Sequence, residues 1–184
     1  MRVRAAVALA CALLSACTLG TWSEEEIDRA YPMARSPALG RRGMEKAVGA
    51  LRARVGGRPR VRSLSLWDDA ASIEAQNPRR PADLDTYTYY RRTLQSPRPV
   101  QMSSSDEEKL EASLFYLDEV PFALIPGLAR RAPTEVGIEG GRVTHLDVRR
   151  DDGVLVMSFS VGSPRRSGSV VYDAAGEVVR ADRM

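Results

Sequence analysis

Apolar side chains recur along the chain first at the spacing of one helical face and then at the spacing of strands. From residue 44 to residue 55 they fall at positions i, i+3, i+4, i+7 and i+11, which are Met44, Ala47, Val48, Leu51 and Val55. Ser36 and Pro37 suit a helix start, and Gly56-Gly57 suits a helix end because glycine accepts the left-handed cap conformation. We predict one long helix here, with its stable part beginning near Arg42.

Strand patterns follow this helix. Val61, Leu64 and Leu66 alternate with polar residues except for one shift, which predicts a strand with a β-bulge. Further strands are predicted around Ala71–Ala75 and over Thr86–Tyr90, with a turn at Asp68-Asp69 and a turn or loop over residues 77–81. The segment Pro99–Met102 is an edge strand at best, because proline cannot donate to the ladder.

The same helix-and-strand pattern recurs later in the chain. The apolar positions of the helix recur 81 residues later, at Ile125, Leu128, Ala129, Ala132 and Val136. The bulged strand recurs at an offset of 82, and Asp151-Asp152 repeats Asp68-Asp69 at an offset of 83. The offset changes only in loops, as expected for a duplicated unit, although amphipathic helices also share a spacing by chance. Pro133 should kink or stop the second helix near Ala132, since it removes a hydrogen bond to Ala129.

Four more elements complete the prediction. Ser103 to Glu108 has the capping residue and negative first turn of a helix, and Leu110, Leu114 and Leu117 give that helix an apolar side. Three strands are predicted at the end of the chain: Val154–Phe159, Ser167–Tyr172 and Val178-Val179. Together these elements predict an α+β fold of two pseudo-repeats, each a helix packed on a three- to four-stranded antiparallel sheet.

The first residues form a separate segment. Arg2 and Arg4 precede an apolar run from Ala5 to Leu14, as in a secretory signal, and the run is only about half as long as a membrane-spanning helix. The run leads into Leu14-Ser15-Ala16-Cys17, which resembles the lipobox of bacterial lipoproteins. This resemblance implies cleavage before Cys17 and acylation of Cys17, including palmitate-like chains. An ordinary signal with a chance cysteine is the alternative.

The lipobox also implies a place in the cell and a division of the chain. Thr18 stands where lipoproteins kept in the inner membrane usually carry aspartate, so the resemblance implies the outer membrane, on its periplasmic side. Cys11 is lost with the signal, so no disulfide can form within the mature chain. We expect a signal over 1–16, a tether over 17–36, a first repeat over 37–102 and a second repeat over 103–184.

The charge of the mature chain is close to balanced. The formal charge of +3 falls to +1 when Arg2 and Arg4 leave with the signal (3 − 2 = 1), so nucleic acid is not an implied partner. Nearly all positive charge is arginine, often in adjacent pairs such as Arg79-Arg80 and Arg165-Arg166. Such pairs could bind the phosphate or carboxylate of lipid headgroups or cell wall, but a solvated face is the commoner role.

The tandem pattern also resembles a family. Gly56-Gly57 followed by the Val61 strand, and Gly140-Gly141 followed by the Val143 strand, resemble the PepSY-like and beta-lactamase-inhibitor-like exported bacterial proteins over residues 41–181. Members of that family are largely non-catalytic inhibitors, partners or accessory proteins of the envelope. The resemblance implies the same kind of role for this chain by analogy.

The chemistry needed for catalysis is mostly missing from the sequence. His145 is the sole histidine, and strand alternation places it on the face opposite Leu146. No nucleophile elbow surrounds a serine and no phosphate-binding glycine loop precedes a helix, so we expect no enzyme, no metal and no cofactor. The aspartate pairs Asp68-Asp69 and Asp151-Asp152 could form an acid–base pair or a calcium site, but turn residues are the favoured interpretation.

Tyrosine and arginine supply the best candidates for binding. Tyr87 and Tyr89 should face the core, which leaves Tyr90 and Arg91 exposed, and we add Arg165 and Arg166 to this candidate interaction surface. The leading hypothesis is a non-catalytic module, held in the membrane by its N-terminal lipid, that binds another envelope protein. The alternative is a carrier or sensor of a small apolar or lipid ligand, which should show an apolar cavity of a few hundred Å³.

Overall fold

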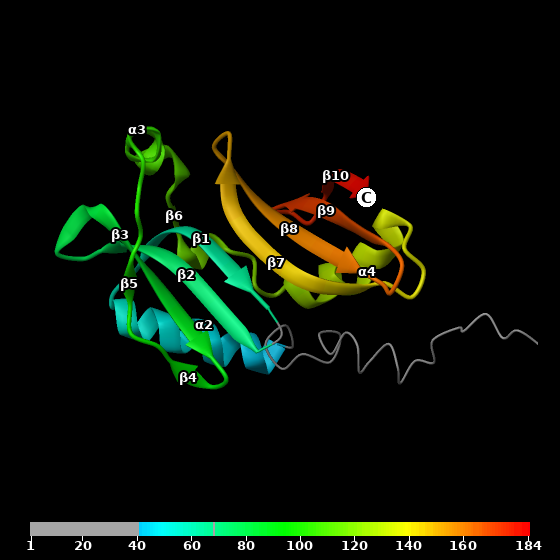
Figure 1. Cartoon of the computed structure of the whole chain (residues 1–184), viewed down its shortest axis with the longest axis horizontal. Coiled ribbons are helices and arrows are strands. Elements are labelled where there is room, and N and C mark those ends of the chain that lie inside the picture. The colour runs from blue at the N-terminus through cyan, green and yellow to red at the C-terminus, as the bar shows by residue number, and fades with distance from the viewer. Residues whose placement is uncertain (1–40, 68) are drawn as a thin grey trace, which may run out of the picture.

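A computed structural model of the chain describes residues 41–67 and 69–184. Three α-helices and one antiparallel sheet make up this part, which gives the predicted α+β class (Figure 1). The helices are α2 (Arg41–Val55), α3 (Ser104–Ser113) and α4 (Ile125–Val136), with a short 3₁₀ helix η2 (Leu117–Glu119). The strands are β1 (Arg60–Leu66), β2 (Ala70–Asn77), β3 (Arg80–Tyr90), β4 (Thr93–Leu94), β5 (Arg98–Pro99), β6 (Phe115–Tyr116), β7 (Arg142–Asp151), β8 (Val154–Gly162), β9 (Ser167–Asp173) and β10 (Val178–Arg183).

One continuous sheet joins the two helix-and-strand units. The strand order is β10-β9-β8-β7-β1-β2-β3-β4, with β5 paired to β3 and β6 paired to β1. The units meet at the β1–β7 pair, where Leu66 lies opposite Leu146 and Leu64 lies opposite Val148. The four leucine and valine side chains at this junction are almost fully buried. Both units therefore share one core.

Helix α2 forms where the sequence predicts it. Met44, Ala47, Val48, Leu51 and Val55 are all buried against the sheet, as the spacing requires. The helix ends where the amide of Gly56 donates to the carbonyl oxygen of Arg52 at 2.9 Å, with Gly56 at φ +85°. The predicted start at Ser36 and Pro37 lies outside the described residues.

Helix α4 corrects one prediction. It does not stop near Ala132 but continues through Pro133 to Val136 and ends at Gly137, which has φ +68°. The carbonyl oxygen of Pro133 accepts hydrogen bonds from the amides of Gly137 and Ile138. Because Ala132 and Val136 are both buried, packing of the last turn offsets the one hydrogen bond that proline removes.

The strands contain both predicted bulges. The pairing of β1 with β2 shifts between Val61 and Ser63, and the pairing of β7 with β8 shifts between Val143 and His145. The turn at Asp151-Asp152 is also present, since Asp151 pairs with Val154 around a two-residue loop.

Several boundaries differ from the prediction. The expected turn or loop over residues 77–81 is a tight turn, in which the Asn77 side chain accepts from the amide of Arg79 at 2.9 Å, and β3 begins already at Arg80. The expected edge strand at Pro99–Met102 is Arg98–Pro99. The last strand, β10, extends well beyond Val178-Val179.

Helix α3 is shorter than its apolar spacing indicates. Ser103 caps it, with the Ser103 hydroxyl and the Asp106 amide and carboxylate forming a capping box. The helix ends at Ser113, so Leu117 is not on its apolar side but in η2, where it joins the main core. Leu110 and Leu114 form a second small cluster with Leu84 of β3.

The two faces of the sheet are covered differently. Helices α2 and α4 pack on one face, which carries the main core. Strand alternation places Leu84 on the opposite face, where α3 packs on Leu84 and also contacts β7. The rest of that face carries no helix within the described residues, and we call this part the helix-free face.

Candidate functional site

The helix-free face of the sheet is lined by small hydroxyl side chains. They alternate with the buried core residues along five strands, and they are Ser63, Ser65, Ser72, Thr88, Ser158, Ser160 and Ser169. The Ser65 hydroxyl donates to the Asp147 carboxylate at 3.0 Å, and the Ser72 and Thr88 hydroxyls lie 3.3 Å apart. Cross-strand pairs of this kind stabilise a sheet and leave a low, polar surface.

One row of residues across this face is aromatic. Ala70 pairs with Tyr90, the amide of Trp67 donates to the carbonyl oxygen of Ala70 at 2.9 Å, and Trp67 stacks on His145 of β7. The Trp67 and His145 rings have centroids 4.9 Å apart and an interplanar angle of 17°. Trp67 is 38% exposed and Tyr90 is 39% exposed, and Ala70, with a single methyl group, stands between them. We call Tyr90, Trp67 and His145 the aromatic row.

His145 is held as a neutral ring within this row. Its Nε2 atom is buried and has no hydrogen-bond partner among residues 41–67 and 69–184. Burial lowers the pKa of His145 below its usual value, and the nearby Asp147 carboxylate opposes this shift only in part. The imidazole stacks against Trp67 and so supports the shape of this surface.

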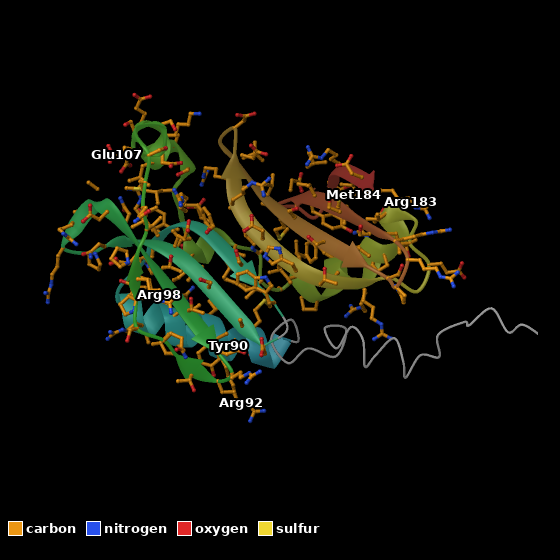
Figure 2. The ribbon with its side chains drawn as sticks, in the orientation of Figure 1. Tyr90, Arg92, Arg98, Glu107, Arg183 and Met184 are labelled. Carbon is orange, nitrogen blue, oxygen red and sulfur yellow. The ribbon has the colours of Figure 1, made fainter. Side chains whose placement is uncertain are left out.

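Tyr90 and Arg91 are both exposed and lie side by side. Arg91 and Arg92 form the two-residue loop between β3 and β4, and the Arg91 guanidinium lies 5.0 Å from the centroid of the Tyr90 ring. The Arg91 side chain also contacts the Asp69 carboxylate at 3.4 Å. Figure 2 shows Arg92 projecting beyond the end of this hairpin. Tyr87 is buried, as expected for the core side of the same strand.

Arg165 and Arg166 lie elsewhere on the sheet. They occupy the turn between β8 and β9, where the amide of Arg166 donates to the Ser163 hydroxyl at 3.1 Å. Three strands, β7, β1 and β2, separate β8 from β3, so about 19 Å of sheet lies between the two arginine pairs at ordinary strand spacing. The four predicted residues therefore form two separate exposed patches and not one contiguous patch.

The helix-covered side offers a groove to a small ligand. Its volume is about 190 Å³, and it is lined by Met44, Glu45, Val48, Gly49, Arg52 and Phe122. This volume is below the few hundred Å³ expected of a lipid or apolar-ligand carrier, and two charged side chains line it. Among the described residues, no group of three or more histidine, cysteine, aspartate or glutamate side chains is placed to hold a metal ion.

Trp67 is the residue that sequence reasoning missed. The signal was available, because Leu64 and Leu66 face the core and Trp67 continues the outward positions Ser63 and Ser65 by two residues. The contact with His145 could not be read from alternation alone, since it depends on the pairing of β1 with β7. The predicted lipidation site, Cys17, lies outside the described residues.

Comparison with known proteins gives one likeness of fold. No protein-family model matches the chain, and no curated protein matches its sequence. A crystal structure from Clostridium difficile 630, named as that of a "putative lipoprotein", superposes with a TM-score of 0.54 at 13% sequence identity, covering 74% of this chain and 90% of that chain. At that identity the likeness shows the fold alone. No helix in residues 41–67 and 69–184 is long and apolar enough to cross a membrane.

Proposed function

We propose that the chain is a non-catalytic, lipid-anchored envelope protein that binds another protein through the helix-free face of its sheet. The observation that carries this proposal is the exposed aromatic row, in which Trp67 and Tyr90 stand on either side of Ala70. Large aromatic side chains are enriched at the centres of protein interfaces, and small hydroxyl residues around them leave room for a flat partner surface.

The anchor is proposed from the lipobox-like residues that end at Cys17. The likeness of fold to a protein that bears a lipoprotein name supports this assignment. We further propose the outer membrane as the destination, on its periplasmic side, because Thr18 follows Cys17. Acyl chains on Cys17, rather than any protein segment, would then hold the domain at the membrane.

The two-repeat organisation, with repeats over 37–102 and 103–184, is part of the proposal. Support comes from the register of the central pair, in which Ser65 lies opposite Asp147, the residue 82 positions later. In the proposed repeat, Leu64 is equivalent to Leu146 and Leu66 is equivalent to Val148. Replacing both members of the pair Leu64–Val148 by their equivalents gives the pair Leu146–Leu66, which is also formed. The two bulges also occupy equivalent places. A duplicated unit that meets its copy across a two-fold axis gives this register.

The test is native mass spectrometry of the acylated protein extracted gently from its own membranes. We expect a stoichiometric protein partner with the unmodified chain, and loss of at least nine-tenths of that complex with Trp67→Ala, since truncating an aromatic hot spot commonly costs about 2 kcal/mol or more. Val179→Ala, on the exposed edge strand β10, is the matched control and should retain the partner. A lipid-sized mass retained by a soluble Cys17→Ser form, with no protein partner, would overturn the proposal in favour of the carrier.

A further inference from the structure

The turns of the sheet fall at two ends that differ in charge. One end carries the β3–β4 loop with Arg91 and Arg92 and the β8–β9 turn with Arg165 and Arg166. The register places both turns at this end, because β3 and β8 run in the same direction through the sheet β8-β7-β1-β2-β3. We call these four arginines the basic end. The acidic side chains in the adjoining connections of the described chain are Asp69 and Glu139.

The opposite end of the sheet carries acidic turns. Asp151 and Asp152 form the β7–β8 hairpin, and Asp173 and Glu177 flank the β9–β10 turn. Arg79 and Arg80 lie at this same end, in the turn between β2 and β3, so this end carries side chains of both signs. The basic end is set apart by its excess of arginine.

The basic end is also where the chain from Cys17 enters the fold. Helix α2 leads into β1 through residues 56–59, so its first residue, Arg41, lies near the point where β1 ends (Figure 1). An acyl anchor on Cys17 would therefore be joined to the domain at the basic end and not at the opposite end. This step rests on the lipid anchor proposed above.

The loop that presents two of the arginines is strained. Arg91 has φ +47° and Arg92 has φ +65°, a left-handed conformation at both positions in which glycine or asparagine is strongly preferred. The two-residue loop between β7 and β8 also has positive φ angles, but it uses Asp152 and Gly153, which suit that conformation. The two arginines therefore lower the stability of the loop. Local backbone strain of this kind often accompanies a binding role.

We propose that the basic end docks on an anionic phospholipid surface and so fixes the orientation of the anchored domain. Guanidinium groups bind phosphate strongly, and Tyr90, half-exposed beside Arg91, has the apolar ring and polar tip that suit the headgroup region. The opposite end of the sheet, which carries the β2–β3 and β7–β8 turns, then points away from the membrane. The aromatic row remains on the face of the sheet, with Tyr90 at the corner where face and basic end meet.

The test measures binding of a soluble Cys17→Ser chain, beginning at residue 17, to phospholipid vesicles by co-sedimentation. We expect binding to mixed phosphatidylcholine–phosphatidylglycerol vesicles and not to phosphatidylcholine alone, with loss of binding at about 0.5 M salt. Each basic residue close to an anionic surface is worth roughly fivefold in affinity, so Arg91→Asn/Arg92→Gly and Arg165→Gln/Arg166→Gln should each weaken binding by at least tenfold. Arg91→Asn/Arg92→Gly should fold at least as stably as the parent, which separates binding from folding.

The matched control is Arg79→Gln/Arg80→Gln in the turn between β2 and β3, which removes the same charge from the other end of the sheet. It should change vesicle affinity by less than about twofold. The proposal would be overturned if the Arg79/Arg80 control lost as much vesicle affinity as the basic-end variants. Binding to neutral vesicles, or no binding to anionic vesicles, would overturn it as well. Binding to purified peptidoglycan without binding to vesicles would also overturn it and would assign the basic end to the cell wall. The Trp67→Ala experiment reports separately on the protein partner.

Discussion

The two halves of the sheet contain hairpins of the same backbone form built from residues of opposite character. In the second half, Asp152 and Gly153 close the β7–β8 loop with positive φ angles that both residues accept. In the first half, Arg91 and Arg92 close the β3–β4 loop in the same region of conformation. The loop residues of the β7–β8 hairpin favour its conformation themselves. The conformation of the β3–β4 loop is instead maintained by the pairing of the neighbouring strands.

The surrounding contacts explain how the unfavourable loop is held. Strand β3 pairs with β2 along nearly its whole length, and Ala70 lies opposite Tyr90 at the base of the loop. The amide of Arg91 donates to the carbonyl oxygen of Asp69 at 2.9 Å, and the amide of Gln95 donates to Thr88 at 2.8 Å. These bonds fix both sides of the hairpin, so the loop residues have no alternative conformation that keeps the pairing.

Weakening the packing of β2 and β3 should therefore destabilise the β3–β4 hairpin more than the β7–β8 hairpin. Ile73→Ala removes a fully buried side chain of β2 that lies opposite Tyr87, and we expect a loss of roughly 2–5 kcal/mol in the free energy of unfolding. Amide hydrogen exchange should show lower protection over Arg91–Gln95 than over the β7–β8 hairpin. Met157→Ala in β8 is the matched control, and an equal loss of protection at both hairpins in both variants would contradict the comparison.

Exchanging the loops should change stability in opposite directions. Arg91→Asn/Arg92→Gly should raise the free energy of unfolding by about 1 kcal/mol, because the loop then suits its conformation. The reciprocal pair Asp152→Arg/Gly153→Arg should lower it by roughly 1–3 kcal/mol. Urea denaturation of both variants measures these changes. If neither exchange alters the midpoint, the arginine loop carries no strain.

The smallest expected effect is a pH dependence of the free energy of unfolding that comes from His145, in the second half of the sheet. The pKa of His145 is lowered by burial, so between that pKa and the usual value near 6.5 the unfolded chain binds more protons than the folded one. Stability should then fall as the pH falls below about 6.5. His145→Gln should remove that part of the slope, measured as unfolding midpoints at several pH values. Ser63 occupies the equivalent place in the first half and carries no such group.

Helices and strands could be predicted where burial repeats with a regular period. The apolar face of α2 and the two bulges were available from spacing alone, since each depends on a few neighbouring residues. Pro133 was expected to kink or stop its helix, and the helix does not stop there, because the burial of Val136 in the last turn is decided by tertiary contacts. Leu117 was misplaced for a related reason, since its spacing fits a helix that ends four residues earlier.

The candidate surface was only partly predictable. Strand alternation predicts that Tyr90 is exposed. It also predicts that His145 lies on the other face of the sheet from Leu146. Whether Arg91 and Arg165 lie together depends on how many strands separate them, which requires the full strand order. The stack of Trp67 on His145 likewise requires the β1–β7 pair, which joins residues far apart in the chain.

The pairing of β1 with β7 also has a consequence for the order in which the protein folds. Strand β1 is made early, yet its partner follows only after β2 to β6 and the helices α3 and α4. The long loop between β1 and β7 must close before the contacts between these two strands can stabilise the fold. This step of folding should therefore be slow. Until then β1 exposes an unpaired edge of the kind that recruits other chains. The interval between the synthesis of β1 and the docking of β7 is therefore the period of greatest risk of aggregation.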